Sequence, residues 1–155
     1  MRVGLGYDIH PIKKGKKLYL GGIKISSSYG LEGHSDADVV LHALADALLG
    51  ACGDKDIGYY FSDKDPRIKG ISSIAIMKKV LSIVKKKRFK IVNVDIVVVT
   101  NAAKISVRRN KIIASVAGLL KIKKSAVSIK GKSNQGLGIL GKNKAIACFA
   151  FCLLK

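Results

Sequence analysis

The chain has 155 residues, enough for one domain that buries a substantial core. Its 48% hydrophobic and 25% charged residues are typical of a globular protein, which excludes a disordered or fibrous chain. The 29 basic residues face only 10 acidic ones, so the formal net charge is +19. This excess is almost entirely lysine, whereas proteins that bind nucleic acid favour arginine. We therefore expect a solvated basic surface and consider nucleic acid the less favoured partner.

The sequence carries no pattern that would direct it to a membrane or out of the cell. No apolar stretch with a small-residue cleavage site follows Met1, so we expect no secretory signal. The longest uncharged apolar run, residues 145–154, is too short to span a bilayer as a helix. The three cysteines form no C-x-x-C pair and are odd in number, which favours reduced thiols. We expect a cytoplasmic protein with no membrane contact.

Strand and helix patterns follow one another along the chain and predict a single α/β (α+β) domain over residues 1–155. Residues 38–51 form a helix with little polar face, which should be deeply buried, and Gly53 follows it as a stop signal. Residues 54–69 are polar and carry Pro66, so we expect a loop there. The other expected elements are strands at residues 2–10, 17–21, 23–26, 91–100, 126–130 and 144–154, and helices at residues 72–87 and 105–120.

The last expected strand, residues 144–154, is apolar on both faces, which is typical of a strand covered on each side. In a chain this small, a second subunit is one way to cover the second face. We therefore expect a symmetric oligomer packed around this strand.

All three histidines lie in the first third of the chain, among carboxylates. Asp8 and His10 are two residues apart in a strand and therefore share a face. Two imidazoles and one carboxylate are a common zinc set, which Asp8, His10 and His42 supply if the strand packs on the helix. Alternatively, His42 is a hydrogen-bonded core histidine and residues 8–10 are a polar strand end. The metal site is favoured because unpaired polar groups are costly to bury.

Acidic residues flank His42 on both sides in the sequence. Asp38, His42 and Asp46 are four residues apart and share one stripe of the helix. We expect Asp38 or Asp46 to orient His42 from behind the metal. Asp36 or Asp38 is also suited to cap the start of this helix.

Three loops are candidates for binding a phosphorylated ligand. The helix start, with His34 and Ser35, offers backbone N–H groups to a phosphate. The carboxylates of residues 56–66 suit sugar-like hydroxyls, although spacing alone favours ordinary turn residues. Residues 130–138 combine glycines, a hydroxyl and amides that would let a diphosphate approach the backbone, but they match neither a Walker loop nor a G-x-G-x-x-G pattern.

Taken together and in order, these segments resemble the 2-C-methyl-D-erythritol 2,4-cyclodiphosphate synthase family of the non-mevalonate isoprenoid pathway. The resemblance covers essentially the whole chain, and its longest motif contains His42. The matching stretches are G-x-G-[FY]-D-x-H at residues 4–10, H-S-D-x-D-V-x-x-H-A-L-x-D-A-L-L-G-A at 34–51, D-I-G-x-x-F-x-D-x-D-P at 56–66 and L-G-x-x-G at 137–141.

The resemblance implies a mainly four-stranded mixed sheet covered by helices on one face, with the sheets packing together in a homotrimer. It implies a lyase that converts 4-diphosphocytidyl-2-C-methyl-D-erythritol 2-phosphate to 2-C-methyl-D-erythritol 2,4-cyclodiphosphate and CMP, by attack of the 2-phosphate on a zinc-bound β-phosphate. Asp8, His10 and His42 would hold one Zn²⁺ per subunit. His34 and Ser133 would stabilise the transition state.

The resemblance also assigns residues to the substrate. Asp56 and Gly58 would hold the methylerythritol hydroxyls, and Lys104 would bind the cytidine diphosphate part from a neighbouring subunit. The substrate-binding residues implied in this way are Ser35, Asp56, Ile57, Gly58, Phe61, Asp63, Asp65, Thr100, Ala102, Ala103, Lys104, Ile105, Ser106, Lys132, Asn134, Gln135, Ile139 and Lys142.

Several of these positions depart from the family pattern. Gln135 stands where the family has a carboxylate that ligates a second divalent ion, Mg²⁺ or Mn²⁺. An amide is a weaker ligand for a hard cation, so we expect weaker binding of this ion. Lys132 would supply part of the missing positive charge, and Ser133 replaces threonine but keeps the hydroxyl. Ala103 replaces a proline of the cytidine loop, which would loosen it.

Two rival functions fit parts of the sequence. A metal-dependent phosphohydrolase would use the same three ligands, because the motifs bind phosphates without naming the attacking group. A nucleic-acid-binding module would use the lysine surface and would show salt-sensitive binding to DNA. The second rival does not explain why the histidines lie together among carboxylates.

Overall fold

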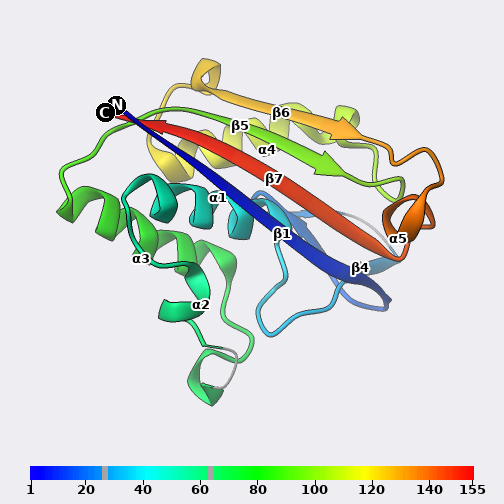
Figure 1. Cartoon of the computed structure of the whole chain (residues 1–155). Coiled ribbons are helices and arrows are strands. Elements are labelled where there is room, and N and C mark those ends of the chain that lie inside the picture. The colour runs from blue at the N-terminus through cyan, green and yellow to red at the C-terminus, as the bar shows by residue number, and fades with distance from the viewer. Residues whose placement is uncertain (26–27, 63–64) are drawn as a thin grey trace.

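Four long strands dominate the computed structural model, which describes residues 1–25, 28–62 and 65–155 (Figure 1). A short strand, β4, extends one edge, and the sheet order is β4-β1-β7-β5-β6. Strands β5 and β6 are parallel and the other neighbours antiparallel, so the expected mixed sheet is confirmed. The strands are β1 (Arg2–Lys14), β4 (Tyr29–Leu31), β5 (Ile91–Val99), β6 (Val127–Lys132) and β7 (Ala145–Leu154), with β2 (Leu18–Leu20) and β3 (Ile23–Ile25) in a separate two-stranded sheet.

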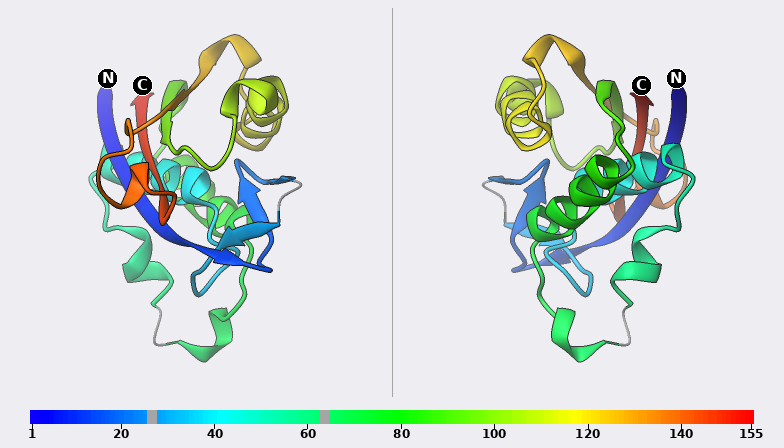
Figure 2. Two further views of the ribbon diagram at one scale, coloured as in Figure 1. Left: turned by 90° about the vertical axis from the view of Figure 1, so that its right-hand side faces the viewer. Right: turned by 90° about the vertical axis from the view of Figure 1, so that its left-hand side faces the viewer.

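The three long helices all lie on one face of the sheet, as expected (Figures 1 and 2). They are α1 (Val39–Ala51), α3 (Ser73–Lys86) and α4 (Ile105–Leu120), and each lies within a residue or two of its predicted bounds. Helix α1 is the most buried, and Gly53 follows it with φ +63°, which agrees with its predicted stop signal. In the described part of the chain, no helix is long and apolar enough to cross a membrane.

The sequence prediction missed the shorter elements. The expected loop at residues 54–69 contains helix α2 (Ile57–Tyr60) and the turn η1 (Pro66–Ile68). Helix α2 forms because the Asp56 side chain accepts the backbone N–H of Tyr59 and caps it. Strand β4, the turn η2 (Lys124–Ala126) and helix α5 (Gly138–Gly141) were also not predicted. The end of the strand expected at residues 23–26 lies outside the described residues.

Strand β1 approaches α1 unusually closely because it presents glycine to the helix. A Cβ added to Gly4 would lie 1.9 Å from the carbonyl oxygen of Ala47, and one added to Gly6 would lie 1.9 Å from that of Ala43. No side chain fits such a gap. The absence of a Cβ at both positions therefore lets β1 lie directly on α1, and this contact brings the next residues of the strand close to His42.

The face of the sheet opposite the helices is left uncovered in the single chain (Figure 2), and several of its exposed side chains are apolar. Leu5 is 55% exposed and pairs with Phe151, which is 42% exposed. Tyr7 pairs with Phe149, and their ring centroids are 4.8 Å apart. We call this surface the open face; its exposed apolar residues are Val3, Leu5, Tyr7, Phe149 and Phe151. Strand β7 therefore does carry apolar side chains on both faces, as expected.

Candidate functional site

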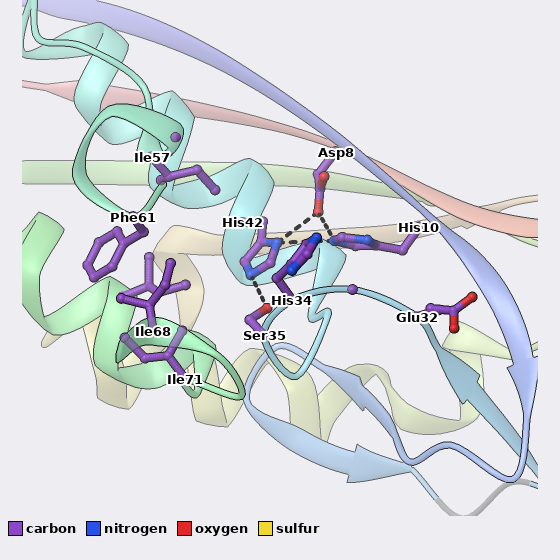
Figure 3. Close-up of a pocket in the computed structure, with 13 residues that line it drawn as sticks. Asp8, His10, Glu32, His34, Ser35, His42, Ile57, Phe61, Ile68 and Ile71 are labelled. Atoms are coloured by element: carbon purple, nitrogen blue, oxygen red, sulfur yellow. Dashed lines mark hydrogen bonds and ion pairs between the residues drawn. The ribbon is translucent and has the colours of Figure 1, made fainter. Parts of the chain in front are cut away.

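One oxygen and two nitrogen atoms converge where β1 crosses α1 (Figure 3). Asp8 Oδ2 lies 3.0 Å from His10 Nε2 and 3.1 Å from His42 Nδ1, and the two nitrogens are 3.2 Å apart. The ligand atoms all lie within 4.8 Å of one another, and the group is only partly exposed. The predicted meeting of Asp8, His10 and His42 is confirmed.

The spacing of these three atoms suits a small tetrahedral cation. Ligands about 2.0–2.1 Å from a tetrahedral zinc ion lie about 3.3–3.4 Å from one another, close to the 3.0–3.2 Å edges of this triangle. Two imidazoles and one carboxylate are also a donor set that zinc accepts, with a fourth position left for water or substrate. The residues present therefore fit a divalent metal ion.

The electrostatics of the group favour a bound cation. Burial alone would raise the pKa of Asp8, but hydrogen bonds with His10 and His42 outweigh it and lower the pKa to about 2. Burial would lower the pKa of His42, but the Asp8 carboxylate outweighs burial and raises it. Asp8 is therefore a carboxylate at neutral pH, and its charge attracts either a proton or a metal ion to His42.

The far side of His42 is held by two hydroxyls. His42 Nε2 lies 3.1 Å from Ser35 Oγ and 2.9 Å from Ser73 Oγ. The prediction that Asp38 or Asp46 orients His42 was wrong, because both carboxylates bind backbone N–H groups. The ring of His42 is nonetheless fixed at both nitrogens, which places Nδ1 toward Asp8 and His10.

Asp38 and Asp46 position the backbone around the site. Asp38 is fully buried, a condition that raises its pKa, and it caps α1 as predicted. Asp46 Oδ1 accepts the backbone N–H of Ile57 at 2.8 Å, so it anchors the start of α2 against α1. The N–H groups that Asp38 accepts are those of Gly21, Gly22, Val40 and Leu41.

A cavity of about 460 Å³ opens from the three ligands, and we call it the metal cavity (Figure 3). Four predicted residues besides the ligands and His34 line it: Ser35, Ile57, Gly58 and Phe61. Asp56 lies next to this wall as the N-cap of α2. Asp65 does not line the cavity, and the prediction for Asp63 falls outside the described residues. The lining residues that the sequence did not indicate are Glu32, Gly33, Ile68, Ile71 and Ile76.

A second cavity, of about 620 Å³, lies at the opposite edge of the sheet between α4 and β6, and we call it the basic cavity. Four cations and no carboxylate line it: Lys104, Arg109, Lys130 and Lys132. Such a surface suits a polyanion. The predicted residues in its lining are Thr100, Ala103, Lys104, Ile105, Ser106, Lys132 and Ser133, whereas Ala102 lines a smaller neighbouring cavity of about 270 Å³.

The remaining predicted residues lie in the segment after β6 and in helix α5. Gln135 has φ +48° and donates from Nε2 to Ser133 Oγ over 2.9 Å. Asn134 donates to the carbonyl oxygen of Leu137. None of Asn134, Gln135, Ile139 and Lys142 lines either cavity, and no described residue lines both cavities. A single chain therefore does not bring His34 and Ser133 into one cavity.

The sequence model described as the YgbB family matches residues 1–155, the whole chain. The chain belongs to the YgbB family. This YgbB-family protein is 46% identical over 154 residues to 2-C-methyl-D-erythritol 2,4-cyclodiphosphate synthase of Halothermothrix orenii, a match that covers 99% of the chain and 93% of that relative.

Solved structures agree with this assignment. The IspF protein of Plasmodium falciparum in its CDP complex is 40% identical, with a TM-score of 0.87 over 99% of this chain and 94% of that one. A 2-C-methyl-D-erythritol-2,4-cyclodiphosphate synthase in its CDP-bound form is 32% identical, with a TM-score of 0.91 over 99% and 100% of the two chains. The YgbB-family protein thus shares its fold with solved structures of 2-C-methyl-D-erythritol 2,4-cyclodiphosphate synthases.

Proposed function

We propose that the protein is a metal-dependent cyclodiphosphate synthase, a phosphorus–oxygen lyase that converts 4-diphosphocytidyl-2-C-methyl-D-erythritol 2-phosphate to 2-C-methyl-D-erythritol 2,4-cyclodiphosphate and CMP. The observation that carries the proposal is the convergence of Asp8, His10 and His42 on one cavity wall, in a chain that matches a synthase relative over almost its full length. The reaction would serve isoprenoid precursor synthesis in the cytosol, where the three free cysteines would stay reduced.

The proposed reaction makes one bond and breaks one. An oxygen of the substrate's 2-phosphate attacks its own β-phosphorus, and the bond from that phosphorus to the oxygen of the α-phosphate breaks. CMP departs with that oxygen, and no water is consumed. Because both reacting groups belong to the substrate, the protein supplies no nucleophile. Its tasks are to bring the 2-phosphate and the β-phosphate of the substrate together and to neutralise charge on the phosphoryl oxygens.

The residues of the metal cavity divide these tasks. Asp8, His10 and His42 would hold Zn²⁺, which when bound supplies a Lewis acid and a template for the β-phosphate. His34 would donate to a phosphoryl oxygen, together with Ser133, and Ser35 would bind the phosphate. The apolar side chains of Ile57 and Phe61 line the cavity and would exclude water, which favours cyclisation over hydrolysis.

The basic cavity would hold the cytidine diphosphate part of the substrate. Lys104 and Lys132 line it and would pair with the diphosphate, and the loop from Thr100 to Ser106 would receive the nucleoside. Asp56 and Gly58 would hold the methylerythritol hydroxyls, with Asp65 near them. Because this cavity and the metal cavity are separate within one chain, we propose that each complete site combines the metal cavity of one subunit with the basic cavity of its neighbour.

A homotrimer is the proposed assembly, and the open face supports it. Exposed apolar patches of this kind in soluble proteins commonly mark contact surfaces. Leu5 and Phe151 lie side by side near its centre, so replacing Leu5 with lysine would place a charge inside the contact. We expect sedimentation equilibrium to give three times the chain mass for the unchanged protein and a smaller mass for Leu5→Lys. A monomeric unchanged protein would rule out the shared site.

The second divalent ion, Mg²⁺ or Mn²⁺, is proposed to bind weakly. The side chain of Gln135 offers a neutral amide, and its nitrogen is already bonded to Ser133. The exposed ammonium group of Lys132, which lines the basic cavity, would take over part of the charge neutralisation.

The test is phosphorus NMR of the purified protein with the proposed substrate, Zn²⁺ and Mg²⁺, beside a His42→Ala variant. We expect CMP and a cyclic diphosphate from the unchanged protein and neither from the variant. Linear phosphate products would indicate a phosphohydrolase that uses the same ligands. No turnover with any divalent metal, together with steeply salt-dependent DNA binding that His42→Ala leaves intact, would indicate a nucleic-acid-binding protein instead.

A further inference from the structure

Behind the metal cavity, a buried serine joins His42 to an acidic residue. Ser73 is the first residue of α3 and is fully buried. Its Oγ donates a hydrogen bond to Asp36 Oδ1, and the same Oγ lies 2.9 Å from His42 Nε2. The backbone N–H of Ser73 donates to the other carboxylate oxygen, Asp36 Oδ2, at 3.0 Å. We call Asp36, Ser73 and His42 the serine bridge.

The hydrogen atoms of the serine bridge can be counted. A serine hydroxyl has one hydrogen, and Ser73 gives it to Asp36, because an ionised carboxylate can only accept. The oxygen of Ser73 can therefore only accept from His42, so Nε2 of the imidazole must carry hydrogen. The other nitrogen of His42, Nδ1, then presents its lone pair toward Asp8 and His10 when the ring is neutral. This is the form of the ring that binds a metal ion.

We propose that Asp36 and Ser73 are positioning residues that hold His42 in its metal-binding tautomer and orientation, and thereby set the metal affinity of the site. The proposal rests on the proposed metal centre and deepens it. Neither residue contacts the three ligand atoms themselves; Ser73 contacts His42 at Nε2, and Asp36 acts through Ser73.

The anchoring of Asp36 makes the serine bridge rigid. The backbone N–H of Asp36 donates to the carbonyl oxygen of Ile71 at 3.2 Å, just before α3 begins. Asp36 therefore ties the loop before α1 to the start of α3 through its backbone and both carboxylate oxygens. The orientation of His42 consequently depends on a segment more than 30 residues further along the chain.

Ser35 offers a second acceptor to the same nitrogen. Its Oγ lies 3.1 Å from His42 Nε2 and already accepts the backbone N–H of Ala37. The hydroxyl hydrogen of Ser35, unlike that of Ser73, is not directed to a carboxylate by the contacts above. The Ser35 hydroxyl can therefore either accept from His42 or donate to it, whereas the Ser73 hydroxyl can only accept. We infer that Ser73, not Ser35, selects the tautomer.

The experiment measures metal affinity without turnover. Co²⁺ and Zn²⁺ binding is followed by competition with a chromophoric chelator, and Co²⁺ binding also by its visible absorption. We expect Ser73→Ala to weaken both metals about 10- to 100-fold, the range found for outer partners of metal-bound histidines. Ser72→Ala is the matched control, because Ser72 caps the same helix end through the N–H of Ala75 and is not among the hydrogen-bond partners of His42 in the described part of the chain.

Asp36→Asn separates the tautomer from packing, since it preserves size and shape. Its amide would donate to Ser73, whose hydrogen would then turn toward His42 and favour the tautomer that cannot bind metal. We expect an affinity loss similar to that of Ser73→Ala, with unchanged thermal unfolding of the metal-free protein.

The outcomes distinguish the two proposals. Wild-type affinity and an unchanged Co²⁺ spectrum in both variants would overturn the role of the serine bridge while leaving the metal centre intact. An unchanged protein that binds neither Co²⁺ nor Zn²⁺ would instead refute the metal centre itself. A loss in Ser72→Ala equal to that in Ser73→Ala would show that the helix end, and not the hydroxyl, is responsible.

Discussion

The two cavities are built in opposite ways. In the metal cavity, His42 comes from the most buried helix and is fixed at both ring nitrogens, and Asp8 belongs to a strand that lies directly on that helix. In the basic cavity, Lys104 and Lys132 are exposed side chains at the ends of secondary structure elements. A metal ion needs ligands in a fixed geometry, whereas a diphosphate can be neutralised by mobile cations. Under the proposed function, the metal cavity is the half of the site that one chain completes alone.

The largest expected effect separates the two cavities directly. Asp8→Ala removes the only carboxylate of the ligand triangle, so metal binding and turnover should fall at least about 100-fold. CMP has no β-phosphate that could reach the metal, so its affinity for the basic cavity, measured by calorimetry, should stay unchanged. Loss of CMP binding in this variant would mean that the two cavities are not independent.

The converse change is expected to be smaller. Lys104→Ala should weaken CDP binding about tenfold, since a hydrogen bond to a charged group contributes about 1.5–3 kcal/mol and this side chain is exposed. Its Co²⁺ affinity should not change. Lys111→Ala is the matched control, because Lys111 is an exposed lysine of the same helix that does not line the basic cavity. Equal losses in both variants would point to general charge and not to a specific contact.

A third change would give the segment beside the basic cavity a carboxylate ligand of the kind that Asp8 supplies in the metal cavity. Gln135→Glu supplies a hard anionic ligand, so the Mg²⁺ concentration for half-maximal turnover should fall about tenfold. Asn110→Asp adds the same charge on the exposed surface of α4 and should leave that concentration unchanged. Comparable Mg²⁺ half-saturation in the unchanged protein and in Gln135→Glu would refute the weakening attributed to Gln135.

The smallest effect concerns the outer support of the metal cavity. Asp54 lies between α1 and α2 in the sequence. Its hydrogen bond with Lys87 and, to a smaller extent, its hydrogen bond with Tyr60 hold its pKa well below the usual 3.8. A carboxyl whose pKa is lower in the folded state stabilises the fold above its unfolded pKa and loses this effect as pH falls through its folded pKa. Asp54→Asn should therefore lower Tm slightly at pH 7, with a difference that shrinks below about pH 4. A pH-independent difference in calorimetric Tm would contradict this.

The sequence predicted the metal cavity better than its supports. The two-residue spacing of Asp8 and His10 and the apolar surroundings of His42 were enough to place three ligands together. The role of Ser73 was not predicted because its partners are more than 30 residues away in the sequence, and no local pattern marks a buried serine at a helix start. Asp46 was assigned to His42 from helical spacing, yet a neighbouring backbone N–H group is its partner.

The β6 side of the basic cavity falls largely in residues 130–138, which the sequence already indicated for a diphosphate, whereas its α4 side was predicted only through family resemblance. The cations of this cavity come from two separate segments, residues 104–109 and 130–132, which the parallel pairing of β5 with β6 brings together. Periodicity gives the individual strands but not their order in the sheet. Helix α2 and strand β4 were missed because such short elements depend on single side-chain or edge contacts.

The bare backbone at Gly4 and Gly6 limits where this metal site could be transplanted. A designer who copied only Asp8, His10 and His42 onto another strand and helix would reproduce the ligands but not the close contact between strand and helix that brings them together. Any side chain at Gly6 would push the host strand off the helix, since its Cβ would meet a carbonyl oxygen at 1.9 Å. A search for scaffolds should therefore first require a strand packed directly on a helix, with glycines two and four residues before the aspartate. Only then should it ask for the three ligands.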